Sequence, residues 1–412
     1  MGTKTLIRLV IALAVTGGVA SILHFTNSGG VSEVESSTSK KKVFGDFPLN
    51  DVATVHIQRK DSGLTLSKGA ATWEVAERDS YPADAEPIIK LLRGIWALEA
   101  VQPVTIGRAQ FGRVSLVDPA EATDDEEAAT ILTFKDASGE SLATLWLGKV
   151  YEKSENRPNP MGGGTAMSDA GRYVKTGGSN AVFLVAQTFT DATTDASDWI
   201  DKSFFKVARI KTIEIITGEK ENDWKLTRDD PDGDYTLVAA KEDEVLDQAK
   251  VTNMKGAFSN PAMEDVLSKA DAGSDENKAA EATFKISTFD GFNYHITTGE
   301  KNEINQVPIS IKVSAKLNEK REAGEDEGDE DKVRLDKEFQ DNLNELKTKL
   351  ANEKKLEGNT YLVRSYLIDN ISKPRSDLMV SENAGAAPGA PGAPQGLPPG
   401  LNLQGIPGLG GQ

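Results

Sequence analysis

A pattern of strands, helix and hairpin occurs twice along this chain, and it constrains the fold more than any other feature. Each copy opens with apolar residues at every second position, Val55 and Ile57 in the first copy and Ile213 and Ile215 in the second. Alternation of this kind is typical of a strand that is buried on one side only. The repetition predicts an α+β fold made of two tandem, related domains with mainly antiparallel sheets.

The opening strand of each copy is followed by a tryptophan strand and then by a helix. Trp73 and Trp224 stand at matching points of the two copies, and both are expected to pack in a core. In the first copy Asp84 is suited to cap a helix, because its short side chain accepts hydrogen bonds from free backbone N–H groups. The second copy has a weaker helical pattern over residues 245–254.

Each copy ends with a hairpin and a strand that contains a tyrosine. The hairpins are predicted at residues 131–147 and 284–297, where short turns interrupt the apolar alternation. The segment around Tyr173, together with residues 182–185, is matched to the strand around Tyr361, and the boundary between the copies is expected near residues 198–205. The copies are expected to differ mainly between these two elements, where the first has a loop rich in Gly and Pro and the second a long insertion.

The N-terminal segment predicts an association with a membrane. An uncharged apolar stretch, residues 9–25, follows Lys4 and Arg8 and would span roughly 25 Å as a helix. A cleaved signal peptide is the alternative, with a cleavage site after Ala20, but the apolar run continues beyond that point. We expect residues 1–26 to form a single-pass transmembrane helix with the bulk of the chain outside the cytoplasm.

The composition of the remaining chain predicts how it divides. Residues 27–42, rich in Ser, are expected to form a flexible stalk. Residues 43–205 form the first predicted α+β domain, and residues 206–382 form the second, with an acidic loop and helix inserted at 316–358. Residues 383–412 carry no charge and are rich in Gly and Pro, which predicts a disordered tail. Whether this tail is only solvated or is bound by a proline-reading partner stays open.

The insertion offers the best candidate for a binding surface. Residues 322–331 hold seven acidic side chains, but their spacing is not that of a calcium-binding loop, and a solvated acidic loop is expected. The helix that follows has apolar residues every three or four positions, so they form one narrow stripe. Either its own domain or a partner must cover this stripe. The candidate partner-binding residues are Leu335, Phe339, Leu343, Leu346 and Leu350.

The sequence does not predict a catalytic, metal or cofactor site. Cysteine is absent and histidine occurs three times, which removes thiolate chemistry and leaves few general bases. The aspartates near Gly233 do not follow the alternation of a cation-binding loop, and Pro231 indicates a turn. The formal net charge of -17 repels phosphate backbones, so we expect no nucleic-acid partner.

Several features of the first copy together form a recognisable pattern. They are the apolar N-terminal segment, the strand of Val55 and Ile57, Trp73, the sequence Tyr81, Pro82, Ala83, Asp84, and Phe111, Gly112, Leu147, Gly148, Tyr173 and Val174. On these residues the first copy resembles the bacterial domain-of-unknown-function family 4340 over roughly residues 43–205. Arg113 and Val114 depart from it, because the family usually has leucine there. The resemblance implies a membrane-anchored extracytoplasmic module, often an auxiliary part of gliding-type ABC transport systems, and supplies no catalytic residues.

The combined prediction is a non-enzymatic interaction or scaffold protein of the bacterial inner membrane. Its expected partners are the lipid bilayer, through the N-terminal helix, and proteins of a membrane complex such as ABC transporter subunits. An extracytoplasmic hydrolase that acts on polysaccharide through paired carboxylates is the alternative. A solute-binding protein with a pocket between the domains is a third hypothesis. The sequence leaves open the identity of the partner, the oligomeric state and cation binding by the acidic loop.

Overall fold

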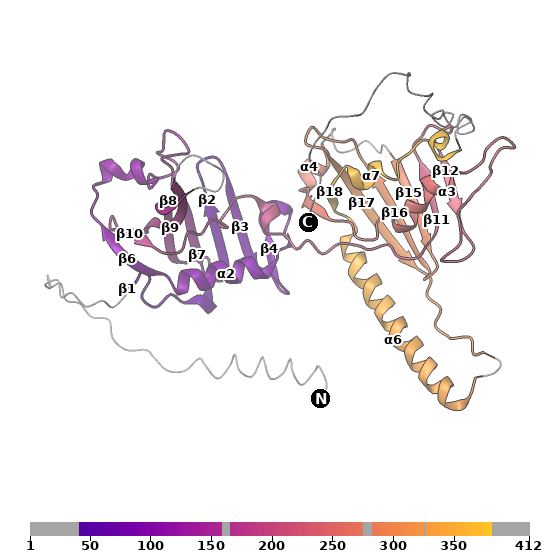
Figure 1. The fold of residues 1–412 in the computed structure, drawn as a ribbon. Coiled ribbons are helices and arrows are strands. Elements are labelled where there is room, and N and C mark those ends of the chain that lie inside the picture. Colours follow the sequence, from indigo (N-terminus) through magenta and orange to yellow (C-terminus); the bar gives the residue numbers. More distant parts are fainter. Residues whose placement is uncertain (1–40, 159–164, 275–281, 325–326, 381–412) are drawn as a thin grey trace, which may run out of the picture. The chain divides into compact units, whose positions relative to one another are not determined.

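The computed structural model describes residues 41–158, 165–274, 282–324 and 327–380 (Figure 1). By its contacts the chain divides into two units, residues 1–41 and residues 42–412, of which the second holds nearly all the described residues. The predicted transmembrane helix, most of the predicted stalk and the predicted disordered tail lie outside the described residues. Lys41 and Lys42, expected at the end of the stalk, form a short strand instead. The second unit is an α+β structure with two antiparallel sheets, which confirms that part of the predicted fold class.

Sheet 1 is built from the strands of the first copy. Its strands lie in the order β1-β6-β10-β9-β8-β7-β2-β3-β4-β5. The 3-10 helices η1 (Leu49–Asp51), η2 (Ala76–Arg78), η3 (Arg108–Val114) and η4 (Ala196–Asp198) and the α-helix α2 (Ala85–Trp96) lie between or after these strands in the chain. In chain order the strands are β1 (Lys41–Lys42), β2 (Thr54–Gln58), β3 (Gly63–Lys68), β4 (Trp73–Val75), β5 (Tyr81–Pro82), β6 (Glu99–Val104), β7 (Thr130–Lys135), β8 (Ser141–Pro158), β9 (Thr165–Thr176) and β10 (Val182–Val185).

Helix α2 covers one side of sheet 1, which we call the inner face. The Asp84 side chain accepts a hydrogen bond from the backbone N–H of Glu86 at 2.9 Å, as expected of an N-cap. Four apolar side chains on one stripe of the helix are buried with the inner residues of the strands. These helix residues are Ile88, Leu91, Leu92 and Ile95.

The opposite, outer face of sheet 1 has a second, smaller apolar cluster. The connection between β6 and β7, residues 105–129, contributes Phe111 and Leu116, which are buried. They pack with Ile131 and Trp146, which alternate along β7 and β8 with residues of the inner face. A connection long enough to fold back therefore covers part of this outer face.

Sheet 2 has the strand order β13-β12-β11-β15-β16-β17-β18-β14. Its helices are α3 (Gln248–Val251), η5 (Thr252–Gly256), α4 (Lys269–Ala272), α6 (Asp329–Glu353), η6 (Lys354–Leu356), α7 (Tyr366–Asp369) and η7 (Arg375–Leu378). Its strands are β11 (Ile210–Ile216), β12 (Trp224–Thr227), β13 (Thr236–Leu237), β14 (Met263–Val266), β15 (Ala282–Thr288), β16 (Phe292–Thr298), β17 (Gln306–Ala315) and β18 (Thr360–Arg364).

The two sheets share one topology. Six neighbouring strands occur in the same spatial order in both sheets. The order is β2-β7-β8-β9-β10-β6 in sheet 1 and β11-β15-β16-β17-β18-β14 in sheet 2. In both sheets the last of these strands follows a helical segment in the chain, α2 in one case and α3 with η5 in the other. Shared strand order, pairing and helix position support the predicted relationship between the copies, while the domain boundaries stay a prediction.

The shared topology corrects two matches made from the sequence. Trp73 lies in β4, two strands away from β2, whereas Trp224 lies in β12, directly beside β11. Tyr173 lies in β9, whose counterpart is β17, whereas Tyr361 lies in β18, the counterpart of β10, so of that match only residues 182–185 correspond to the strand of Tyr361. Similar short apolar patterns recur in neighbouring strands, so a pattern alone did not fix which strands correspond.

The copies also differ at two places rather than one. In sheet 1 the hairpin of β8 and β9 is long, with register from Leu145 and Thr176 to Pro158 and Thr165, where a loop was expected. In sheet 2 the insertion with α6 lies between β17 and β18, which corresponds to the short turn between β9 and β10. Because these connections leave different ends of different strands, they do not change the shared sheet order.

Candidate partner-binding surface

Helix α6 carries the five predicted partner-binding residues, and the structure divides them into two groups. Leu343 is buried, and Leu346 and Leu350 pack against the main apolar cluster. Leu335 and Phe339, nearer the N-terminal end, are half-buried like Leu346 and Leu350, but they do not pack against that cluster. Figure 1 shows the C-terminal end of α6 beside the strands of sheet 2 and its N-terminal half beyond them. The protein itself covers one end of the stripe and leaves the other end accessible.

Two small hollows border the accessible end of the stripe. One has a volume of about 270 Å³ and lies between α6 and the segment that follows β17, with Leu317 and Phe339 among its lining residues. The other, about 570 Å³, is lined by residues 318–322 and again by Phe339. Phe339 therefore lies at the border of both hollows, where an apolar side chain of a partner would find a partly formed pocket.

An ion-pair cluster fixes the segment that leads into α6. The Arg321 guanidinium donates from Nη2 to Glu327 Oε2 at 2.6 Å and from Nε to Asp336 Oδ1 at 2.9 Å. The Arg321 guanidinium, followed by the backbone N–H of Gly324, lowers the pKa of Glu327 to about 2. The expectation of a purely solvated acidic loop is wrong for Glu327. Asp329, Glu330 and Asp331 form the first turn of α6, where acidic side chains suit the positive end of the helix dipole.

The opposite end of α6 is held by a buried carboxylate. Glu353 Oε1 accepts a hydrogen bond from the backbone N–H of Lys206 at 2.9 Å, and Oε2 accepts one from the Tyr294 hydroxyl at 2.8 Å. Burial, followed by the charge of Glu353, raises the pKa of Tyr294. Lys349 Nζ lies 3.9 Å from Glu353 Oε1 and 4.6 Å from the centroid of the Phe292 ring.

The sequence did not identify this anchor, because Glu353 is one of 64 acidic residues with nothing to mark it. Its one local signal is Lys349 four residues earlier, on the same side of the helix. The residues that it binds, Lys206 and Tyr294, come from the connection before β11 and from β16, and only the fold brings them together. The anchor sets the position of α6, because two hydrogen bonds fix the last turn of the helix.

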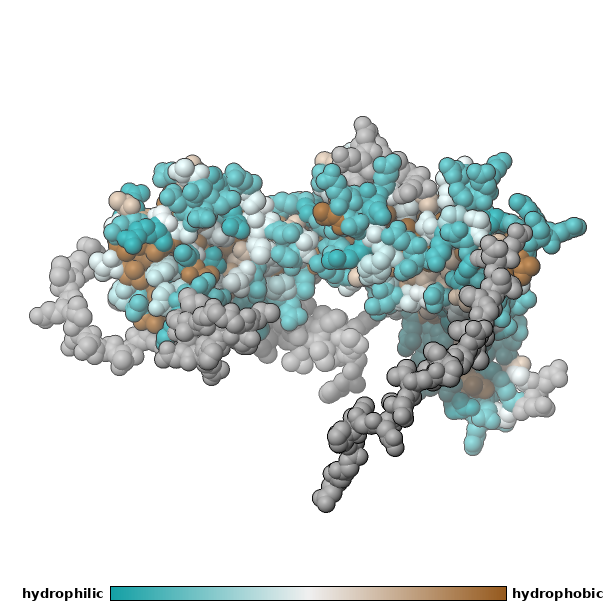
Figure 2. Space-filling model, turned by 45° about the horizontal axis from the view of Figure 1, so that its top comes forward, coloured by the Kyte–Doolittle hydropathy of each residue, from teal (hydrophilic) through white to brown (hydrophobic). Residues whose placement is uncertain are grey.

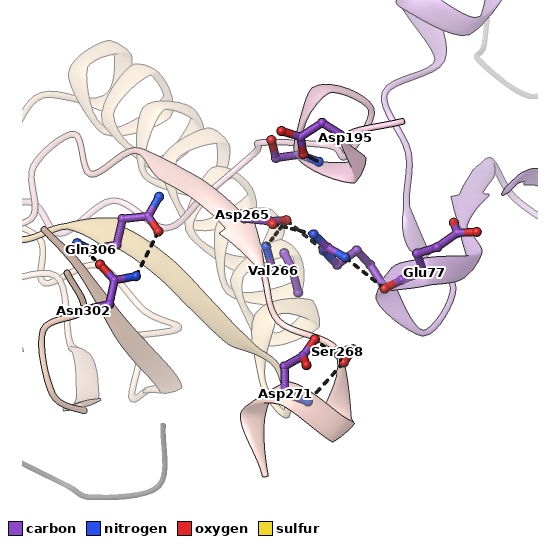
Figure 3. A network of polar contacts seen from close by, with 10 residues as sticks. Glu77, Asp195, Asp265, Val266, Ser268, Asp271, Asn302 and Gln306 are labelled. Atoms are coloured by element: carbon purple, nitrogen blue, oxygen red, sulfur yellow. Dashed lines mark hydrogen bonds and ion pairs between the residues drawn. The ribbon is translucent and has the colours of Figure 1, made fainter. Parts of the chain in front are cut away.

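A second polar network joins η2 to β14 (Figure 3). Arg78 donates from Nη2 to Asp265 Oδ2 at 2.6 Å and from Nε to Asp265 Oδ1 at 3.0 Å, a bidentate pair that is largely buried. The backbone N–H of Lys269 donates to Asp79 Oδ2 at 2.6 Å. The Tyr81 and Tyr361 rings meet edge to face, with centroids 6.2 Å apart. These contacts link the first copy to the second, and sequence patterns gave no sign of them.

One groove of sheet 1 bears on the hydrolase alternative, because two carboxylates line it. It has a volume of about 880 Å³, lies between α2 and residues 186–199, and contains Asp191 and Asp198. Asp191 pairs with Lys90 at 2.6 Å, and Asp198 accepts a hydrogen bond from the Thr193 hydroxyl at 2.7 Å. Both carboxylates therefore already have structural partners, and the hydrolase hypothesis gains no support from them.

The described part of the chain has no group of three or more His, Asp or Glu side chains placed to hold a metal ion. The aspartates near Gly233 form a turn, in which Asp230 Oδ1 accepts from the backbone N–H of Asp232 at 3.0 Å. Over the same residues no helix combines the length and the apolar character needed to cross a bilayer. The face of the molecule shown in Figure 2 is mainly hydrophilic, with small separate hydrophobic areas.

Comparison with known proteins gives a partial match to one family model and no function. Residues 161–282 match the model of a family described as Domain of unknown function (DUF4340). This is the family that the sequence resembles, although the matched segment overlaps the expected residues 43–205 only from 161 onward. The match runs from the β8–β9 hairpin of sheet 1 to the beginning of β15 in sheet 2. No curated protein and no solved structure gives a significant match.

Proposed function

We propose that this protein is a non-enzymatic interaction or scaffold protein, held at the bacterial inner membrane by residues 1–26 with its folded part outside the cytoplasm. The observation that carries the proposal is the division of the α6 stripe. Leu335 and Phe339 lie outside the main apolar cluster, while the far end of the same helix packs against it and is fixed by Glu353. A partner that covers these two residues removes apolar area from water at little cost in ordering, because the helix is already formed.

The more specific form of the proposal is an auxiliary role in an ABC-type transport complex. It depends on the family resemblance and on the uncharged N-terminal stretch, and it names membrane proteins as the partners of α6. The proposal does not depend on any chemistry in the groove between α2 and residues 186–199.

Site-directed photocrosslinking in native membranes tests the proposal. A photoreactive amino acid at Leu335 should give a crosslinked species, whereas the same group at Asp341, on the opposite side of α6, should not. The double change Leu335→Asp with Phe339→Asp should abolish the crosslinked complex and leave the melting temperature of the protein nearly unchanged. Equal crosslinking from both positions, or a complex that survives the double change, would show that this end of α6 is not a binding surface.

A matched pair of substitutions separates binding from folding. Leu343→Asp with Leu346→Asp places two charges where the protein covers its own helix, so unfolding should become easier by several kcal/mol. If this pair leaves stability intact and removes the complex instead, the partner covers the whole stripe and the division of α6 is wrong.

A further inference from the structure

The outer face of sheet 2 carries a row of charged side chains that crosses five neighbouring strands. Lys225 of β12 is opposite Glu214 of β11, and Glu214 is opposite Lys285 of β15. Lys285 is opposite His295 of β16, which in turn is opposite Lys312 of β17. We call these five residues the cationic row. They lie on the side of the strands that does not face the main core.

The charges of the cationic row are not balanced within the protein. Glu214 is the single acidic residue among those that line this groove, and it lies 3.3 Å from Lys225. Over the described residues, neither Lys285 nor Lys312 forms an ion pair, and both are exposed together with His295 between them. Three lysines against one glutamate give the row a formal charge of +2 in a chain whose formal net charge is -17, and an anion would balance it.

The surroundings of the row add hydrogen-bonding groups and a concave shape. A parallel row of hydroxyl and amide side chains, Thr212, Ser287, Asn293 and Ser314, runs beside it. Both rows line a groove of about 610 Å³. Tyr294, the aromatic residue of this stretch of β16, is 2% exposed and belongs to the core, so the groove offers no aromatic surface for stacking nucleic-acid bases.

The corresponding row in sheet 1 is uncharged apart from a histidine. Thr65, His56, Thr133 and Thr144 are opposite one another on β3, β2, β7 and β8, the counterparts of β12, β11, β15 and β16. Within this row the His56 ring is hydrogen-bonded to the Thr65 hydroxyl at 3.1 Å. The shared topology therefore does not require lysines at these positions, and the cationic row is a property of sheet 2.

We propose that the cationic row binds an extended acidic segment of a partner protein. The lysines stand on alternate strands, so their backbones are spaced by about 9.6 Å, twice the distance between neighbouring strands. A polyproline-type peptide repeats every three residues over about 9.3 Å, so acidic residues at every third position would meet successive lysines. The hydroxyl and amide side chains of the parallel row can form hydrogen bonds with the backbone of the bound peptide. The inference takes its class of partner from the proposed function but uses a surface separate from α6.

Fluorescence anisotropy with the full-length protein in detergent tests this site. The probe is a labelled peptide of three Glu-Pro-Ala repeats, and the matched control peptide has Gln in place of each Glu. We expect the acidic peptide to bind, the Gln peptide to bind at least tenfold more weakly, and added salt to weaken the acidic complex. Lys285→Gln with Lys312→Gln should raise the Kd at least tenfold. Lys202→Gln with Lys220→Gln, which removes two exposed lysines outside the groove, should not change it.

Several results would overturn the proposal. The assigned site would be wrong if the acidic peptide failed to bind. It would also be wrong if both pairs of lysine substitutions weakened peptide binding equally, or if Lys285→Gln with Lys312→Gln did not weaken it. Binding of an anionic polysaccharide such as polygalacturonate, without binding of the peptide, would replace the proposed partner class by a glycan. Because Leu335→Asp with Phe339→Asp leaves this face untouched, that variant should bind the peptide normally, so failure here and failure of the α6 proposal are distinguishable.

Discussion

The outer faces of the two sheets differ although their strands follow the same order. In sheet 1 the connection of residues 105–129 lies over part of this face, and Phe111 and Leu116 pack on apolar strand residues. In sheet 2 the same face carries lysines, a histidine, hydroxyls and an amide that line a groove. The comparison shows that one sheet topology can have either a second core or a polar groove on the same face. The connection and the outward residues decide which one forms.

The inner faces differ in how their helices are attached. Helix α2 packs on sheet 1 through four buried apolar side chains. Helix α6 reaches the core only at its C-terminal end, and there it combines leucines with the buried Glu353. Apolar packing tolerates small shifts, whereas a buried carboxylate with two donors fixes position and direction. The second arrangement suits a helix whose other end extends away from the sheet.

The largest effect is expected from removing the cover of sheet 1. Phe111→Ala should lower the free energy of unfolding by about 3–5 kcal/mol, because a buried ring leaves a cavity in the smaller cluster. His295→Ala, on the same face of sheet 2, should change it by less than about 0.5 kcal/mol. Urea denaturation measures both. Similar losses for the two variants would mean that the outer faces do not differ as described.

A smaller loss is expected at the anchor of α6. Glu353→Ala should cost about 2–3 kcal/mol, since the Lys206 N–H and the Tyr294 hydroxyl lose their common acceptor in a buried place. Glu353→Gln keeps the shape and one acceptor and should cost less. Thermal unfolding of the two variants orders them. If Ala and Gln have equal effects, the carboxylate contributes through volume alone.

The contact between η2 and β14 should contribute less again. Arg78→Ala breaks the bidentate pair with Asp265, and because both side chains remain partly exposed we expect about 1–3 kcal/mol. Arg364→Ala, which removes a pair with Glu264 that is more exposed, should lower stability less than Arg78→Ala does. Chemical denaturation compares them. A larger loss of stability for Arg364→Ala would mean that the Arg78–Asp265 pair contributes less than an exposed pair within sheet 2.

The smallest expected effect is a change in the pKa of Glu327. This residue lies in the insertion between β17 and β18, where sheet 1 has only a short turn. The pKa of Glu327 is lowered to about 2 by Arg321, below the value of about 4.3 in an unfolded chain. The ion pair therefore stabilises the fold fully above pH of about 4.3, and this contribution is lost as the pH falls through about 2. NMR titration of the side-chain carboxyl should show the Glu327 pKa rising toward its ordinary value in Arg321→Gln.

Glu244 provides the control for this titration. Its pKa is also lowered to about 2, by the hydrogen bond from Arg375 at a distant position in the chain. It should not change in Arg321→Gln. A shift of both carboxyls, or of neither, would contradict the local assignment.

Sequence patterns predicted the elements better than their correspondence. The alternation at Val55 and Ile57, the Asp84 cap and the two hairpins all lie where they were expected. Local patterns define such elements because side-chain direction alternates along a strand and capping involves adjacent residues. Matching Trp73 to Trp224 failed because the same pattern fits any strand that is buried on one side. Strand neighbours are set by pairing over long separations, which no local pattern contains.

The sequence by itself determined the α+β class with antiparallel sheets, the helix with a leucine stripe and the absence of cysteine chemistry. Tertiary structure alone decided which end of that stripe is covered, that Glu353 meets Tyr294, and that Arg78 meets Asp265. It alone aligned Lys225, Lys285 and Lys312, which are far apart in the chain, into one row. The physical reason is that charge and apolarity belong to residues, whereas burial and neighbourhood depend on the register in which distant strands pair.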